Sequence, residues 1–207
     1  MTKWEPLFSE DCEALKGPGH RCEKCDRLDR FHGHLNKVAW WAGKFAEGMF
    51  PTGSEEGKAA REWGYLAGLW HDLGKFAPEW QAYLKTKADP HRSDVSGKLP
   101  HARSGAKHSV DTLPNVGMLF AFLISGHHSG LGNGIDSTDS SLEKQLGKSV
   151  PEFLPFVPAS ILDAAPEIFL PKFSVSSPTS LGIFLRFLFS ALVDADFLAT
   201  EAFMSHD

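Results

Sequence analysis

The sequence predicts an all-α fold, and three observations support that prediction. Apolar residues recur every three to four positions over several long stretches, which is the period of an amphipathic helix. No alternating pattern of convincing length predicts a half-buried strand. The most apolar stretch, residues 181–199, contains Arg186, Asp194 and Asp196, which favours a buried helix over a membrane span.

Composition is that of an ordinary globular protein. The chain has 207 residues, of which 42% are hydrophobic and 23% charged, enough for one domain with its own core. The formal net charge of −5 gives no overall electrostatic signature of nucleic-acid binding, so any such binding must be local. Three cysteines and no secretory signal predict a reducing, cytoplasmic compartment without membrane association.

The apolar spacing predicts most helices and the breaks between them. Ser54 and Ser177 are candidate N-caps, the latter followed by Pro178 at the first helical position. We expect loops at 88–100 and 127–134, and we leave the Pro-rich residues 150–178 unassigned. The expected helices cover 34–47, the run from Ser54 into "LAGLWHDLGKF" (66–76), "PEWQAYLK" from Pro78, 101–112, 115–126, 139–147 and the stretch from Pro178 onward.

Histidine and aspartate residues border these apolar segments in five places. The phrases are "FHGHLNKVA", "LAGLWHDLGKF", "LPHARSGAKHS", "LISGHHSGL" and "LVDADFLATE". Five elements of a helical bundle can thus aim imidazoles and carboxylates at one point in its core, where metal sites are commonly built. Each pair alone also fits a satisfied core histidine or a solvated turn, but their joint occurrence favours a metal centre.

The donor types indicate the class of metal. Mixed imidazole and carboxylate ligands suit zinc, manganese, iron, nickel or cobalt better than calcium or magnesium alone. The adjacent His71 and Asp72 can serve two ions if the carboxylate bridges them. Two ions about 3.5–4 Å apart can clamp the attacking and leaving oxygens of a phosphoryl displacement.

The order of these residues resembles the HD phosphohydrolase superfamily. The fuller wording resembles the HD nuclease domain of Cas3, the effector of type I CRISPR systems. The similar phrases are "HGHLNKVA", "LAGLWHDLGKF", "PHARSGA", "SGHHSGL" and "RFLFSALVDADFLATE", which span about residues 30–203. The resemblance implies an HD-domain helical bundle with a metal site in its core over residues 31–207, preceded by an N-terminal extension at 1–30.

The resemblance also implies the roles of particular residues. Asp72 would bridge two ions, and Lys75 would face the phosphate or steady Asp72, so these two are the candidate catalytic residues. Asp194 remains an alternative to Asp196, and His108 is not expected to be a ligand. The implied metal ligands are His34, His71, Asp72, His101, His127, His128 and Asp196.

The implied activity is that of an enzyme, a metal-dependent endonuclease that cleaves single-stranded DNA during CRISPR interference. Two divalent ions (Mn, Ni, Co or Fe, with Mg a further option) would lower the pKa of a bridging water and stabilise the leaving oxygen. The implied partners are single-stranded DNA, a Cas3 helicase and a Cascade-type surveillance complex. The sequence has no GxxxxGK[ST] phosphate loop, so we expect the helicase to follow in a longer parent protein or to be a separate subunit.

Several alternatives stay open. A nucleotide phosphohydrolase or phosphodiesterase of the same superfamily would need a closed pocket for base and sugar, and a non-catalytic metal-binding interaction module would hydrolyse nothing. Cys22 and Cys25, with His20 and either Cys12 or His32, match half of a zinc motif, or are ordinary reduced cysteines. Basic residues at 85–108, with exposed tryptophan rings, form either a strand channel or a solvated loop.

Overall fold

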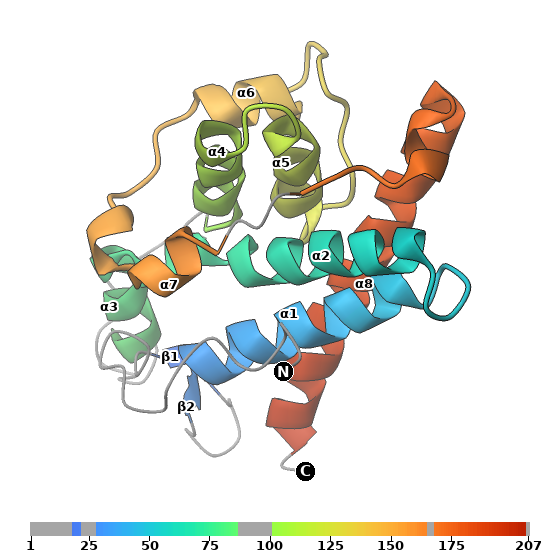
Figure 1. Cartoon of the computed structure of the whole chain (residues 1–207). Coiled ribbons are helices and arrows are strands. Elements are labelled where there is room, and N and C mark those ends of the chain that lie inside the picture. Colours follow the sequence, from blue (N-terminus) through green and yellow to red (C-terminus); the bar gives the residue numbers. More distant parts are fainter. Residues whose placement is uncertain (1–17, 22–27, 87–100, 165–167, 206–207) are drawn as a thin grey trace.

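The computed structural model of the chain describes residues 18–21, 28–86, 101–164 and 168–205 (Figure 1). This part of the chain is helical apart from one short hairpin, which confirms the predicted all-α class. Three 3-10 turns connect the helices: η2 (Leu73–Phe76), η3 (Leu154–Phe156) and η4 (Lys172–Val175). The helices are α1 (Phe31–Glu47), α2 (Glu55–Trp70), α3 (Pro78–Thr86), α4 (Ala102–Thr112), α5 (Gly117–Gly126), α6 (Leu142–Gly147), α7 (Ala159–Leu162) and α8 (Pro178–Ser205).

A hairpin precedes α1, where the sequence predicted only an irregular extension. Strand β1 (Pro18–Arg21) pairs antiparallel with strand β2 (Leu28–Arg30). Strands of four and three residues are too short to show a period of two in the sequence, which is why the pattern missed them. The candidate zinc ligands Cys12, Cys22 and Cys25 lie outside the described residues, so the zinc site stays a prediction.

The two expected N-caps are present. The backbone N–H of Gly57 donates to Oγ of Ser54 at 3.1 Å, which satisfies a free donor at the start of α2. At the start of α8 the backbone N–H of Ser180 donates to Oγ of Ser177 at 3.0 Å, next to Pro178 at the first helical position. Local sequence therefore determined where these two helices begin.

Helices α1 and α2 pack closely because the residues at their contact are small. A Cβ atom on Gly68 would lie 2.7 Å from Cα of Ala39, and one on Gly64 would meet the carbonyl oxygen of Ala42. Real Cβ atoms do not approach so closely, so the two backbones can touch only where these glycines stand. The contact places the first turns of α1 beside the carboxyl end of α2.

Two tryptophans of α2 hold the segment that follows α6. The indole N–H of Trp63 donates to the backbone oxygen of Phe169 at 3.0 Å. Two turns later, the indole N–H of Trp70 donates to the backbone oxygen of Ile161 at 2.9 Å. Both rings are fully buried. The described parts of residues 150–178 are thus fastened along α2, an arrangement that their sequence did not predict.

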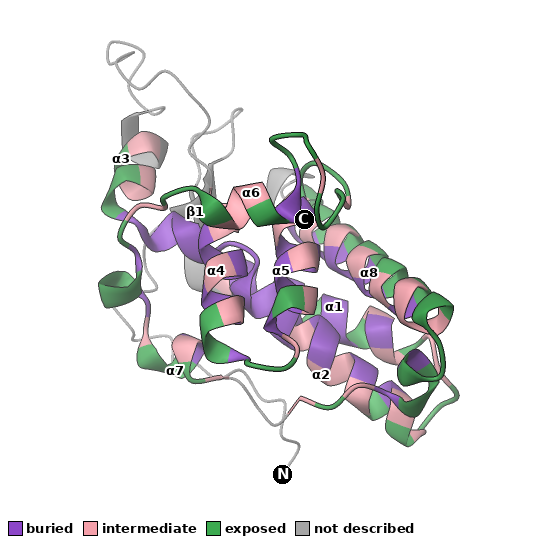
Figure 2. Cartoon of the chain, turned by 90° about the horizontal axis from the view of Figure 1, so that it is seen from above, coloured by how far each residue is buried: buried purple, intermediate pink, exposed green. Residues whose placement is uncertain are grey.

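Helix α8 buries one face, whereas the sequence predicted a helix buried all round. Phe184, Leu188 and Leu192 are buried against α1, α2 and η4. Phe187 and Phe197 lie on the other face and are 52% and 65% exposed, and Figure 2 shows this outer face largely uncovered. Apolar residues on every face made the two situations indistinguishable in the sequence. Within the described residues, no helix combines the length and apolarity needed to cross a membrane.

We expect Gly68→Ala to lower the free energy of unfolding by about 1–3 kcal/mol, because the added methyl group overpacks the contact with α1. Urea denaturation followed by tryptophan fluorescence measures the change. Gly147→Ala is the matched control, since a Cβ there meets no atom within 4 Å. Equal stabilities of the two variants would show that α1 and α2 do not touch at Gly68.

Candidate metal centre

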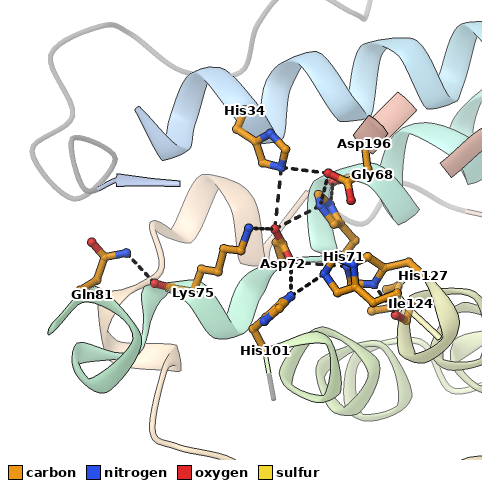
Figure 3. A network of polar contacts seen from close by, with 11 residues as sticks. His34, Gly68, His71, Asp72, Lys75, Gln81, His101, Ile124, His127 and Asp196 are labelled. Atoms are coloured by element: carbon orange, nitrogen blue, oxygen red, sulfur yellow. Dashed lines mark hydrogen bonds and ion pairs between the residues drawn. The ribbon is translucent and has the colours of Figure 1, made fainter. Parts of the chain in front are cut away.

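The centre forms where α2 ends. His71 still has helical angles (φ −57°, ψ −33°), but Asp72 does not (φ −115°, ψ 20°), and the 3-10 turn η2 follows. The expected continuation of the helix through this doublet is therefore wrong. On an unbroken helix the two side chains would point about 100° apart. The break allows both to face the same point (Figure 3).

The approach of α4 to this turn depends on Gly74. A Cβ atom on Gly74 would lie 2.6 Å from Cα of His101 and would also meet its carbonyl oxygen. With glycine in place, His101 sits at the start of α4 with Nε2 3.2 Å from Oδ1 of Asp72. A glycine within the "HDLGK" phrase is thus required for one of the candidate ligands to reach the centre.

All seven predicted ligands come together in the fold, in two groups. The donor atoms of each group lie within 4.8 Å of one another. They project from α1, the end of α2, the start of α4, the end of α5 and α8 (Figure 3). These buried groups could bind a metal ion, although their individual roles as ligands stay predictions. One group is Asp72, His101, His127 and His128, and the other is His34, His71 and Asp196.

The carboxylate of Asp72 faces both groups. Its Oδ2 lies 3.3 Å from Nε2 of His71 and 3.7 Å from Nε2 of His34. Its Oδ1 lies 3.2 Å from Nε2 of His101 and 3.6 Å from Nε2 of His127. Each group therefore receives one oxygen, which is what a carboxylate bridging two ions must provide.

Asp196, rather than Asp194, reaches the centre. Its Oδ1 lies 3.3 Å from Nε2 of His34 and 3.7 Å from Nε2 of His71. Asp194 is exposed on α8 and belongs to neither group. His108 is also in neither group.

Lys75 forms an ion pair with Asp72. Its Nζ lies 2.6 Å from Oδ2, and the lysine is only 3% exposed. Of the two predicted roles, the structure contains the contact with Asp72. Nε2 of Gln81 donates to the backbone oxygen of Lys75 at 2.6 Å, which fastens the turn that carries the lysine (Figure 3). The buried cation offsets part of the cost of burying a carboxylate.

The imidazoles of His71 and His127 are held with Nε2 toward the centre. Their Nδ1 atoms donate to the backbone oxygens of Gly68 and Ile124, at 2.6 and 2.7 Å. Metal-binding histidines are commonly oriented by such a bond at the second ring nitrogen. Within the described part of the chain, these Nε2 atoms and Oδ1 of Asp196 are buried without a hydrogen-bond partner. A bound cation would supply that missing partner, so the donor set fits a metal.

The charges of the centre shift the pKa values of its members. Burial alone would lower the pKa of His71, but the charges of the neighbouring carboxylates of Asp72 and Asp196 raise it to about 10. Burial opposes ionisation of both carboxyls, yet the imidazoles beside them hold the pKa values of Asp72 and Asp196 below their usual range. Burial lowers the pKa values of His101 and His128 to about 4. At neutral pH the imidazole of His71 is therefore protonated, whereas those of His101 and His128 are neutral.

Two basic residues of the 85–108 run bind α6 and the residues after it. An Nη atom of Arg103 donates to Oε1 of Gln145 at 2.7 Å. Nζ of Lys107 donates to the backbone oxygen of Lys148 at 3.0 Å. These contacts join α4 to α6. The other basic side chains of the run are outside the described part of the chain, so the strand channel stays a prediction.

No protein-family model matches the sequence, and no curated protein matches it. Membership of the HD superfamily, and the likeness to the Cas3 nuclease domain, therefore rest on the sequence phrases and stay predictions. The chemistry available to the seven side chains follows from their geometry.

We expect two ions per chain in the wild-type protein. Asp196→Ala removes a donor from the group with His34 and should leave about one ion. Asp72→Ala removes a donor shared by both groups and should weaken both sites. Metal content after equilibrium dialysis against Mn²⁺ or Co²⁺ measures these numbers. Asp194→Ala is the matched control and should retain two ions, because that carboxylate lies outside the centre. Equal losses of metal from Asp194→Ala and Asp196→Ala would contradict the assignment.

Metal binding should depend on pH differently in the two groups. The raised pKa of His71 means that an ion must displace its proton, so affinity at that group should rise about tenfold per pH unit between pH 6.5 and 8. His101 and His128, with pKa values near 4, are already neutral there, so these two side chains should release no proton when an ion binds. Calorimetric titration in buffers of different ionisation enthalpy counts the released protons. Equal proton release at both sites would contradict this assignment.

Proposed function

We propose that this protein is a metal-dependent endonuclease of the HD phosphohydrolase type that cleaves phosphodiester bonds in single-stranded DNA. The observation that carries the proposal is the carboxylate of Asp72, with one oxygen toward each of two groups of candidate ligands. Two adjacent cation sites sharing a carboxylate suit the in-line displacement of a phosphoester oxygen.

The side chains have distinct tasks in this proposal. When bound, two divalent ions supply a hydroxide near neutral pH and neutralise charge on the phosphodiester. Asp72 holds the two groups in register, and Lys75 stabilises its ionised form through the 2.6 Å contact. The hydrogen bonds from His71 and His127 to backbone oxygens keep Nε2 of each ring aimed at the ions. Mn, Ni, Co and Fe suit this donor set.

The substrate and partners are proposed from the sequence phrases that resemble the Cas3 nuclease domain. They favour single-stranded DNA, cut within the strand, and action in the cytoplasm during CRISPR interference. Strand separation would be performed by a Cas3 helicase, as a further domain or a separate subunit, recruited to a surveillance complex. The net charge of −5 agrees with a nuclease whose bound cations, rather than its overall charge, attract the DNA.

A nucleotide phosphohydrolase is the second candidate, and one cavity favours it. The cavity is about 310 Å³, and its lining includes Gly126 and Ser129, which flank His127 and His128 in the sequence, but neither histidine. Hydroxyl and amide groups suited to hydrogen-bonding a base or a sugar line it, among them those of Ser125, Ser129 and Asn133. A free nucleotide could occupy it, whereas the endonuclease would pass a strand beside it.

Circular single-stranded DNA distinguishes these functions, because only an endonuclease can cut a strand without ends. We expect metal-stripped protein to nick the circle once Mn²⁺, Ni²⁺ or Co²⁺ is added. Asp72→Ala should lower the rate more than about 100-fold, since even residues that only support metal ligands contribute 10–100-fold. Asp194→Ala, outside the centre, should retain the wild-type rate.

Two results would contradict the endonuclease, and a third would contradict the role of Asp72 in it. Release of phosphate or nucleoside from free nucleotides, with the circle intact, would support the phosphohydrolase. Metal binding without hydrolysis of either substrate would indicate a non-catalytic metal-binding interaction module. Nicking that persists in Asp72→Ala would show that the chemistry lies elsewhere.

A further inference from the structure

The candidate metal centre is partly exposed. His34 and His71 are fully buried and Asp72 is 1% exposed. By contrast, the side chains of His101 and Asp196 are 14% and 16% exposed, and His128 is exposed. A substrate can reach the centre past these three side chains, which form its exposed rim, and residues on that rim can contact what flanks the reacting phosphate.

Trp80 lies on this rim. Its ring centroid is 4.7 Å from that of His101. The ring of Tyr83, about one turn further along α3, has its centroid 5.2 Å from that of Trp80. Because Nε2 of His101 is 3.2 Å from Asp72, Trp80 is separated from the centre by a single imidazole ring. The hydrogen bond from Gln81 to the backbone oxygen of Lys75 fixes α3 against the turn that carries this lysine (Figure 3).

The indole of Trp80 is only partly covered by the fold. The residue is half-buried, and its ring lies against that of His101. Its Nε1 is buried without a hydrogen-bond partner among the described residues, so no ligand contact is assigned to that atom. A partly exposed aromatic side chain beside the candidate centre suits contact with an aromatic group such as a nucleobase.

We propose that Trp80, with Tyr83 beside it, is a stacking platform for the nucleobase adjacent to the phosphodiester bond that the centre cleaves. The inference rests on the proposed endonuclease function and assigns a positioning residue to it. Stacking is available to every base, so the platform binds the strand without selecting its sequence. It acts on substrate binding rather than on the chemical step, and its loss should therefore appear in KM.

A purely structural role for Trp80 would give different results. If the ring only braced His101, its removal would lower metal content and would slow cleavage of every phosphodiester equally. If the ring stacks on a base, its removal leaves metal content unchanged and matters only for substrates that have bases. Substrates with and without bases therefore separate the two roles.

The experiment compares wild type, Trp80→Leu and Trp80→Phe on a single-stranded oligonucleotide and on an abasic strand of the same length, with Mn²⁺ content measured in parallel. We expect Trp80→Leu to raise KM for the normal strand roughly 5- to 100-fold, at an almost unchanged kcat. Trp80→Phe, which keeps a ring, should recover most of the affinity. Trp40→Leu changes a tryptophan that is 43% exposed on α1 and should have no effect.

On the abasic strand, wild type and Trp80→Leu should have the same KM. Unchanged KM of Trp80→Leu on the normal strand, or equal losses on both strands with reduced metal content, would overturn the platform while leaving the endonuclease intact. The wild-type comparison needs no variant: equal KM values for the normal and abasic strands would overturn the platform alone. Absence of wild-type cleavage on both strands would instead overturn the proposed function and the platform with it.

Discussion

The buried carboxylate of Asp72 is the group around which the centre is organised. Removing an ionised carboxylate from water costs several kcal/mol unless close partners replace its hydration. Here the partners are the ammonium of Lys75 and imidazoles that arrive from separate helices, two on each oxygen. Without that negative charge, the ammonium group and the imidazoles would be buried together with no carboxylate between them. The negative charge of Asp72 thus stabilises the neighbouring side chains in the absence of metal, and it is the charge that two cations would share.

Close backbone contacts bring these donors within reach. Gly68 lets α2 touch α1, so the histidine on α1 meets the one at the end of α2, with ring centroids 5.5 Å apart. Gly74 lets the turn after the doublet touch the start of α4. Neither glycine contributes a donor. Each lacks the Cβ atom that would hold apart two elements carrying candidate ligands. The geometry of the centre therefore depends on glycine at these two positions.

The sequence predicted which side chains are candidate metal donors better than it predicted where those side chains point. The candidate ligands stand in local phrases such as "HGHL" and "GHHS", and the helix starts follow from Ser54 and Ser177. The end of α2 before the doublet was not predicted, because the apolar spacing continues past Trp70 through Leu73 and Phe76. The resemblance favoured Asp196 over Asp194, but helical spacing alone did not decide between them. Their difference is which face of α8 meets the core, and that face is set by packing against α1 and α2.

The tryptophans illustrate why residue type alone does not identify a stacking surface. Trp63 and Trp70 donate their indole N–H groups to backbone oxygens and hold residues 150–178 along α2, so they serve the fold. Trp40 lies edge-on against a neighbouring indole on α1, with centroids 4.7 Å apart. Trp80 differs from these because its half-buried ring contacts His101, one of the candidate metal ligands. Its position beside the candidate centre, rather than its residue type, is what makes it a surface on which a substrate group can stack.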